Sequence, residues 1–145
     1  MRAKARAHSS RAYRCRAFGD YWPGNLLWRR DDLVAVLDWE STKVGEPLYD
    51  LAITRLDVLW VFGAQAMQEL TELYLARSGV DARDLSRWDL RVALRPMGNL
   101  ARWAKAYPDP PLSRHDIDEP YLRAGHHWFV KQAIEQLSSA PSSRT

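Results

Sequence analysis

The chain has 145 residues, of which 46% are hydrophobic, and this suffices for one globular domain with a buried core. No apolar run reaches the length of a membrane-spanning helix, so we expect no membrane insertion. The formal net charge is +3 at pH 7, and Cys15 is the only cysteine. A single cysteine excludes an internal disulfide and fits a cytoplasmic protein.

The basic character is concentrated at the start of the chain, where residues 1–17 hold six Lys or Arg side chains and no acid. The rest carries 15 basic and 18 acidic side chains, a net charge of about −3. Basic starts of this kind occur in transit peptides and in nucleic-acid-binding arms. Because this one lacks apolar periodicity and interleaved aromatic residues, we favour a disordered leader and do not expect nucleic acid as a partner.

A loop and a β-hairpin are predicted next. A Pro-Gly pair indicates a turn within residues 20–25, and two β-prone runs follow at 26–28 and 33–37. In an antiparallel pair, the start of the first strand lies beside the end of the second. Asn25 and Asp38 occupy these two ends, so the hairpin should bring them together.

The remainder of the chain shows apolar residues at helical spacing. Pro96 should kink or divide the third helical segment, and Asp118 is a candidate N-cap for the last. Trp60, Trp88 and Trp128 fall on apolar faces and are expected in the core. The predicted helices cover residues 46–62, 64–78, 84–106 and 118–137, and a polar tail is expected over 138–145.

Asp20, Asn25 and Asp38 have the spacing of a kinase catalytic loop and its metal-binding aspartate. Phosphoryl transfer requires a group that orients the acceptor hydroxyl and accepts its proton, which is the role expected for Asp20. It also requires oxygen ligands for magnesium, which Asn25 and Asp38 would supply. Magnesium usually takes only one or two protein ligands, so this set is sufficient.

Three blocks of sequence resemble the aminoglycoside phosphotransferase and choline kinase family of small-molecule kinases. They are GDYWPGNLLW at 19–28, VLDWE at 36–40 and GEPLYDLA at 45–52, in the order and spacing of the family. The resemblance covers about residues 18–137. It implies an α+β, mostly helical fold, the C-terminal lobe of a protein-kinase-like domain, in which a short catalytic β-hairpin precedes four to five helices.

The same resemblance implies functional roles for individual residues. Asp20 would be the catalytic base, and Asn25 and Asp38 would bind the cofactor, Mg²⁺ with ATP. Asp50 would be a structural support that hydrogen-bonds the backbone of the catalytic loop, since a buried carboxylate needs such partners. The family has the sequence His-Gly-Asp at the start of this loop, and its His supports the loop. This chain has Phe18 in place of that His, so the change concerns loop geometry more than proton transfer.

A second departure is the missing N-terminal lobe, because no Gly-rich loop and no lysine-bearing strand precede the catalytic loop. We therefore expect a truncated phosphotransferase, which is a gene fragment, the product of a misplaced start or one piece of a split protein. Its expected partners are a missing N-terminal lobe or further copies of the chain. The predicted function is ATP-dependent transfer of a γ-phosphoryl group to a hydroxyl of a small molecule, such as an aminoglycoside, a macrolide or choline. The alternative is a non-catalytic kinase-like fragment that acts as a binding or assembly module through exposed apolar surface.

Overall fold

The computed structural model describes residues 15–110 and 112–139. This part is α+β and mostly helical, and a short hairpin precedes the helices, which confirms the fold class. None of its helices is long and apolar enough to cross a membrane. The strands are β1 (Cys15–Ala17), β2 (Leu26–Arg29), β3 (Asp32–Val36) and β4 (Lys43–Gly45); the helices are α1 (Pro47–Ser78), α2 (Leu85–Val92), α3 (Leu100–Ala104) and α4 (Glu119–Ser139).

The strands form two separate antiparallel ribbons. The predicted hairpin is confirmed as β2 paired with β3, and Arg30 turns the chain between them with φ of 56°. The second ribbon, β1 with β4, was not predicted. The prediction of a disordered leader over residues 1–17 was therefore wrong for its last three residues, which form β1. Residues 1–14 lie outside the described part. Of the tail expected over 138–145, Ser138 and Ser139 belong to α4, and residues 140–145 lie outside the described part.

The helical segments follow the sequence pattern closely. Gly63 has φ of 91° and ψ of 176°, which breaks α1 into two segments that match the helices predicted at 46–62 and 64–78. Pro96 lies between α2 and α3 and divides the third predicted helix, as expected. The carboxylate of Asp118 accepts a hydrogen bond of 2.8 Å from the Tyr121 amide, so it caps α4 as predicted.

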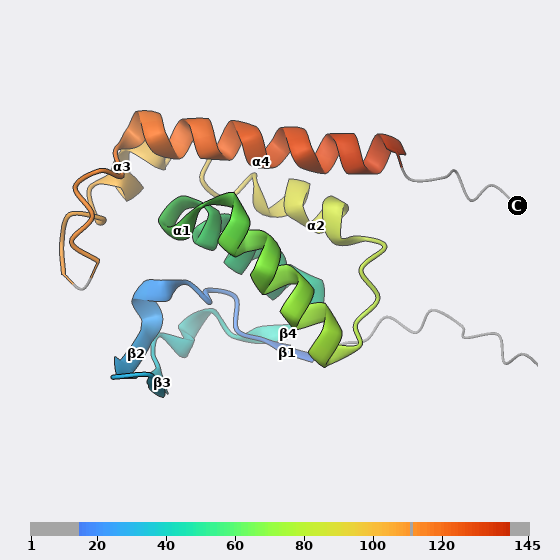
Figure 1. Ribbon diagram of the computed structural model, residues 1–145, viewed down its shortest axis with the longest axis horizontal. Coiled ribbons are helices and arrows are strands. Elements are labelled where there is room, and N and C mark those ends of the chain that lie inside the picture. The colour runs from blue at the N-terminus through green and yellow to red at the C-terminus, as the bar shows by residue number, and fades with distance from the viewer. Residues whose placement is uncertain (1–14, 111, 140–145) are drawn as a thin grey trace, which may run out of the picture.

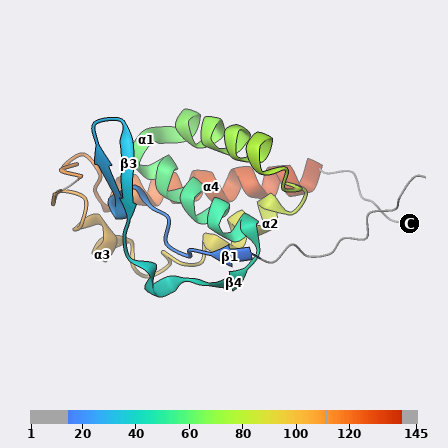
Figure 2. The same ribbon diagram turned by 90° about the horizontal axis from the view of Figure 1, so that it is seen from below.

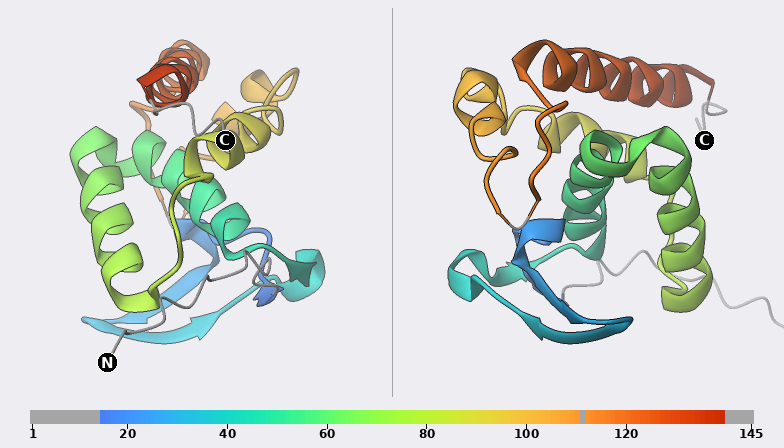
Figure 3. Two further views of the ribbon diagram at one scale, coloured as in Figure 1. Left: turned by 90° about the vertical axis from the view of Figure 1, so that its right-hand side faces the viewer. Right: turned by 60° about the vertical axis from the view of Figure 1, so that its left-hand side comes forward.

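The elements form layers, with the two ribbons on one side and α4 on the opposite side (Figure 1). Helices α1 and α2 lie between them and contact each other as well as α4. Figure 2 shows the β2–β3 hairpin extending from the helical body. In Figure 3 the two segments of α1 fold back on each other, and a hydrogen bond of 2.5 Å from Arg55 Nη1 to Thr71 Oγ1 joins them.

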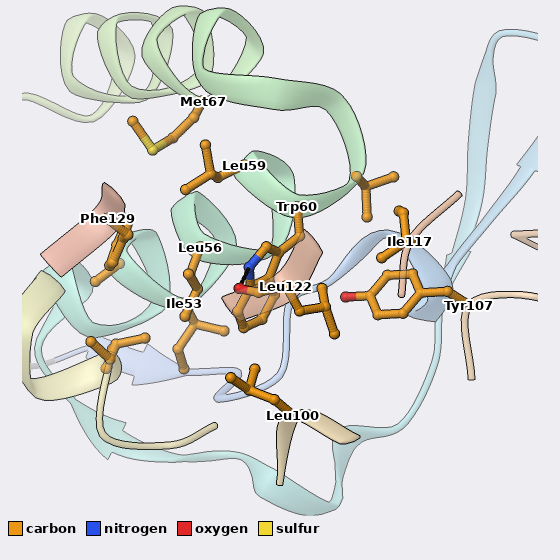
Figure 4. Close-up of a cluster of buried hydrophobic side chains, with 14 residues drawn as sticks. Ile53, Leu56, Leu59, Trp60, Met67, Leu100, Tyr107, Ile117, Leu122 and Phe129 are labelled. Carbon is orange, nitrogen blue, oxygen red and sulfur yellow. Dashed lines mark hydrogen bonds between the residues drawn. The ribbon is translucent and has the colours of Figure 1, made fainter. Parts of the chain in front are cut away.

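The core lies where α1, α4 and the α2–α3 region meet (Figure 4). Trp60 is fully buried and donates a hydrogen bond of 3.0 Å from Nε1 to the Leu122 carbonyl, which satisfies its one polar group. Trp88 is partly buried, whereas the expectation for Trp128 was wrong, since 42% of it is exposed. Figure 4 shows Ile53, Leu56 and Phe129 among the other core residues.

One buried ion pair ties three helices together. The guanidinium of Arg55 on α1 contacts both carboxylate oxygens of Asp89 on α2, at 3.1 and 2.9 Å. Gln132 on α4 donates a further hydrogen bond of 3.2 Å to Asp89. Both charged side chains are buried, so their partners are needed to offset the loss of solvation.

Candidate active site

The loop between β1 and β2 holds Asp20 and Asn25 in direct contact. The side-chain amide Nδ2 of Asn25 donates to the backbone oxygen of Asp20 at 3.0 Å and to its carboxylate Oδ2 at 3.1 Å. The short helical turn Pro23–Asn25 brings the two residues together, since the backbone N–H of Asn25 donates a hydrogen bond to the Trp22 carbonyl. The loop thereby fixes the carboxylate of Asp20 relative to Asn25.

The hairpin brings the chain after β3 back to Asn25. Leu26 pairs with Val36, and the amide of Leu37 donates a hydrogen bond of 2.8 Å to the Asn25 carbonyl. Asp38 follows directly, exposed, with φ of 62° and ψ of 60°. This left-handed conformation is uncommon for a residue other than glycine, and such outliers cluster at functional sites.

The donor set of the two predicted metal ligands fits magnesium. Because Nδ2 of Asn25 makes both side-chain hydrogen bonds, its Oδ1 is left without a hydrogen-bond partner among the described residues. The carboxylate of Asp38 is also exposed to solvent. Residues 15–110 and 112–139 contain no cluster of three or more His, Cys, Asp or Glu that could hold a metal. Amide and carboxylate oxygens in small number suit magnesium, which keeps its waters and phosphate ligands.

Asp50 on α1 supports the start of the loop that carries Asp20. Its Oδ2 accepts a hydrogen bond of 2.6 Å from the Phe18 amide, and its Oδ1 accepts one of 2.8 Å from the Gly19 amide. This is the contact that the family resemblance implied for Asp50. One turn later, the Thr54 hydroxyl donates a hydrogen bond of 3.0 Å to the Tyr21 carbonyl. Helix α1 therefore holds the backbone on both sides of Asp20.

Phe18 supports the loop by aromatic packing. Its ring is buried and lies edge-on against Trp39 at 4.8 Å and against Tyr21 at 6.0 Å between centroids. Trp39 directly follows Asp38, so this packing joins the loop that carries Asp20 to the segment that carries Asp38. The aromatic ring thus provides support at the position where the family has a histidine.

The backbone of Gly19 requires a glycine. Its φ is +86°, and a Cβ built there would lie 2.6 Å from the carbonyl oxygen of Ser41. The loop that carries Asp20 therefore passes directly over the chain after Asp38, closer than any other residue would permit.

Two residues that the sequence did not single out interact electrostatically with Asp20. Arg95, in the segment between α2 and α3, places Nη2 at 3.3 Å from Asp20 Oδ1. Asp57 on α1 is half-buried, and burial raises the pKa of its carboxyl group to about 8; Arg95 opposes this shift and Asp20 adds to it. No local pattern identifies either residue, because their interaction with Asp20 arises from long-range packing.

Other polar residues near the end of the chain have structural partners. His126 Nε2 lies 2.7 Å from the Ala93 carbonyl, a contact that joins α4 to the end of α2. Asp116 pairs with Arg114, and Glu119 pairs with Arg123. These acids, together with the helix cap Asp118, stabilise the loop and the start of α4.

Comparison with known proteins gives matches in sequence, and no solved structure matches. Acyl-CoA dehydrogenase family member 11 of Rattus norvegicus is 31% identical over 97 residues, and the Mus musculus protein of that name gives the same values. The Pongo abelii protein is 29% identical over 93 residues. The alignments cover 55%, 55% and 52% of this chain, but the chain spans only 12% of each relative's length.

The sequence model of the Phosphotransferase enzyme family matches residues 2–91. The match begins ahead of residue 18, the start of the resemblance noted in the sequence, and it includes the loop that carries Asp20, the β2–β3 hairpin and the whole of α1. It contains Asp20, Asn25, Asp38 and Asp50. The family predicted from the three sequence blocks is thereby confirmed, and the chain belongs to the phosphotransferase enzyme family.

Proposed function

We propose that the chain is an ATP- and magnesium-dependent phosphotransferase domain that transfers a γ-phosphoryl group to a hydroxyl of a small molecule. The observation that carries the proposal is the pair of hydrogen bonds from Asn25 to Asp20, together with the strand pairing that brings Asn25 to the residue before Asp38. A cytoplasmic location, where ATP and magnesium are available, is part of the proposal.

In this reaction, the acceptor oxygen bonds to the γ-phosphorus while the bond from that phosphorus to the bridging oxygen of ADP breaks. Asp20 is the base: its carboxylate orients the acceptor hydroxyl and takes its proton. Asn25 keeps Oδ2 of Asp20 in place, and Asp50 and Thr54 hold the backbone around it. Most of the rate enhancement then comes from positioning and from compensating charge on the phosphates.

Asn25 and Asp38 would hold the magnesium. When bound, the ion neutralises phosphate charge and orients the γ-phosphoryl group. The chain contributes the amide oxygen of Asn25, whose nitrogen is engaged with Asp20, and the exposed carboxylate of Asp38.

The acceptor belongs among small hydroxyl compounds. Aminoglycosides, macrolides and choline are the acceptors suggested by the family resemblance. The relatives' name, acyl-CoA dehydrogenase family member 11, adds acyl-CoA compounds that carry a chain hydroxyl. Trp39 is exposed beside Asp38, and Trp22 packs on Tyr107; these are the aromatic side chains that would contact an acceptor.

Calorimetric titration of the chain with ATP and magnesium tests the proposal. We expect magnesium-dependent binding that is lost in Asp38→Ala, with near-ultraviolet circular dichroism showing that both proteins are folded. The acceptor panel named above would then be screened for ADP release, with Asp20→Asn as the inactive control. A folded chain that does not bind ATP with magnesium would contradict the proposal.

The second candidate, a binding or assembly module, is favoured by the apolar surface of the β2–β3 hairpin. Leu27, Trp28, Leu33 and Val34 are all large apolar residues that are 41% to 57% exposed. Trp28 lies opposite Leu33 in the strand pairing and Leu27 lies opposite Ala35, and exposed apolar surface of this kind marks interaction sites. Sedimentation equilibrium of the chain and of a Trp28→Ser, Val34→Ser variant tests it: concentration-dependent association that the variant abolishes would support a module, and a monomer in both would contradict it.

A further inference from the structure

Arg95 places a positive charge directly beside the proposed base. Its Nη2 lies 3.3 Å from Oδ1 of Asp20, and about one third of each of these two side chains is exposed. A guanidinium carries several N–H donors in a rigid fork, and Nη2 is the one side-chain nitrogen of Arg95 with an acceptor among the described residues. Its Nε and Nη1 are therefore free to bond a bound molecule.

The backbone that carries Arg95 is held in place on both sides. Two residues earlier, the carbonyl of Ala93 lies 2.7 Å from Nε2 of His126 on α4. The residue that follows Arg95 is Pro96, which is fully buried. The guanidinium is therefore presented to Asp20 from a fixed point of the chain between α2 and α3.

Arg95 lies on the acceptor side of Asp20. Asn25 donates to Oδ2 of Asp20 and Arg95 donates to Oδ1, so the carboxylate lies between the proposed metal ligand and the guanidinium. In the proposed function, magnesium and the phosphates of ATP belong on the side of Asn25. The acceptor hydroxyl must reach the same carboxylate, and Arg95 is the charged group that faces it at the other oxygen.

The charges around this site disfavour a cationic acceptor. Asp57 is another carboxyl group on which the charge of Arg95 acts, and burial raises the pKa of Asp57 to about 8, so it is protonated at neutral pH. A cationic acceptor would thus meet Arg95 as a like charge, whereas an oxyanion would meet hydrogen-bond donors. The acids around the start of α4 have partners within the chain: Asp116 with Arg114, Glu119 with Arg123, and Asp118 with the amide of Tyr121.

We propose that Arg95 is a specificity-determining residue, which selects acceptors that carry an oxyanion, a carboxylate or a phosphate, in addition to the hydroxyl that is phosphorylated. The planar fork of a guanidinium binds either group through paired hydrogen bonds. Of the acceptors suggested above, aminoglycosides and choline are cationic, whereas acyl-CoA compounds carry phosphates. That the oxyanion belongs to the acceptor rests on the proposed function, but binding of an oxyanion at Arg95 does not.

Binding is tested on the full chain with small probes that share one carbon skeleton and differ in charge. Glycerate and glycerol phosphate carry an oxyanion, glyceramide is neutral and aminopropanediol is cationic. At matched pH and ionic strength and without ATP, we expect both anions, and neither of the other probes, to shift the Nε–H signal of Arg95 in nitrogen-15 NMR. This signal is assigned by its absence in Arg95→Gln. Arg87→Gln, at an exposed arginine paired with Asp84, is the matched control and should keep the response.

An Arg95 signal that shifts with neither anion, or equally with glyceramide, would overturn the proposal, and the wild-type chain decides this even if a variant fails to fold. A response to one anion alone supports the proposal and identifies carboxylate or phosphate as the group that is bound. If magnesium and ATP abolish the response, Arg95 binds the phosphates of the nucleotide, and selection of the acceptor is rejected. Failure of the ATP titration with the response intact would reject the proposed function alone.

In an active chain, acceptor selection is measured as the ratio of kcat/KM for glycerate to that for glyceramide. Arg95→Gln should lower this ratio about 10-fold to 100-fold, because hydrogen bonds to a charged group are lost only with the anion. Loss of the ion pair with Asp20 should affect both acceptors alike, so the ratio reports recognition rather than the position of the base. An unchanged ratio in the folded variant would overturn the proposal.

Discussion

The carboxylate of Asp50 accepts a hydrogen bond of 2.8 Å from the backbone amide of Gly19, which joins α1 to the loop directly before Asp20. The second oxygen of Asp50 accepts the amide of Phe18 in the same way, at 2.6 Å. Hydrogen bonds to an ionised acceptor are stronger than neutral ones. One side chain of the first helix therefore fixes two consecutive peptide groups of the loop.

Replacement of Asp50 with Ala should lower the free energy of unfolding by about 1–3 kcal/mol, because two amides lose their acceptor. Urea unfolding followed by circular dichroism measures this change. Glu69→Ala, at an exposed position on the second segment of the same helix, is the control and should change stability much less. Equal stability of Asp50→Ala and wild type would show that the two hydrogen bonds contribute nothing net.

Gly19→Ala should destabilise the chain by about 2–5 kcal/mol, because it combines an unfavourable φ with a steric clash. The added Cβ would lie 2.6 Å from the Ser41 carbonyl oxygen. Gly79→Ala separates the two effects, since Gly79 has φ of +66° but no atom within 4 Å of a Cβ. Thermal unfolding of both variants should show the larger loss for Gly19→Ala; similar losses would exclude a contribution from the clash.

Asp89→Ala should cost about 3–5 kcal/mol, because it leaves the buried guanidinium of Arg55 without its charged partner. The exposed pair of Asp84 and Arg87 provides the comparison, and Asp84→Ala should change stability by only about 0–1 kcal/mol. Denaturant unfolding of both variants checks this difference. A loss for Asp89→Ala as small as that for Asp84→Ala would contradict the inferred role of the buried pair.

The stability of the chain should depend on pH through Asp57. Its pKa is raised by folding, to about 8 from an ordinary value of 3.8, so the folded state binds the proton more tightly than the unfolded state. The contribution of this group to stability is fully present below about pH 4, falls as the pH rises from about 4 to about 8, and is lost above that.

Asp57→Asn removes this titration. The variant should be more stable than wild type at pH 9, where the wild-type carboxylate is ionised, and the two should converge toward pH 4. Urea unfolding of both proteins between pH 4 and pH 9 gives the difference directly. A difference that stays constant across the range would show that Asp57 has similar pKa values in the folded and unfolded chain.

The local structure was predictable because its causes lie in adjacent residues. Gly63 and Pro96 interrupt helices through their own backbone restrictions, and Asp118 caps α4 through an amide three residues away. The hairpin followed from two β-prone runs and the short polar turn between them. The β1–β4 ribbon was missed, because two strands of three residues carry little pattern, and their pairing depends on the loop packing between them.

The sequence by itself determined the family, the order of the helices and the hairpin, and the spacing of Asp20, Asn25 and Asp38, since these depend on neighbours within one loop or hairpin. Only the tertiary structure decided which distant groups surround Asp20. Arg95 is 75 positions away in the chain, and it reaches Asp20 because α2 packs against α1. The charge state of Asp57 likewise depends on its burial and on the charges of Arg95 and Asp20. The packing of the helices and the loop establishes the burial and brings these charges near.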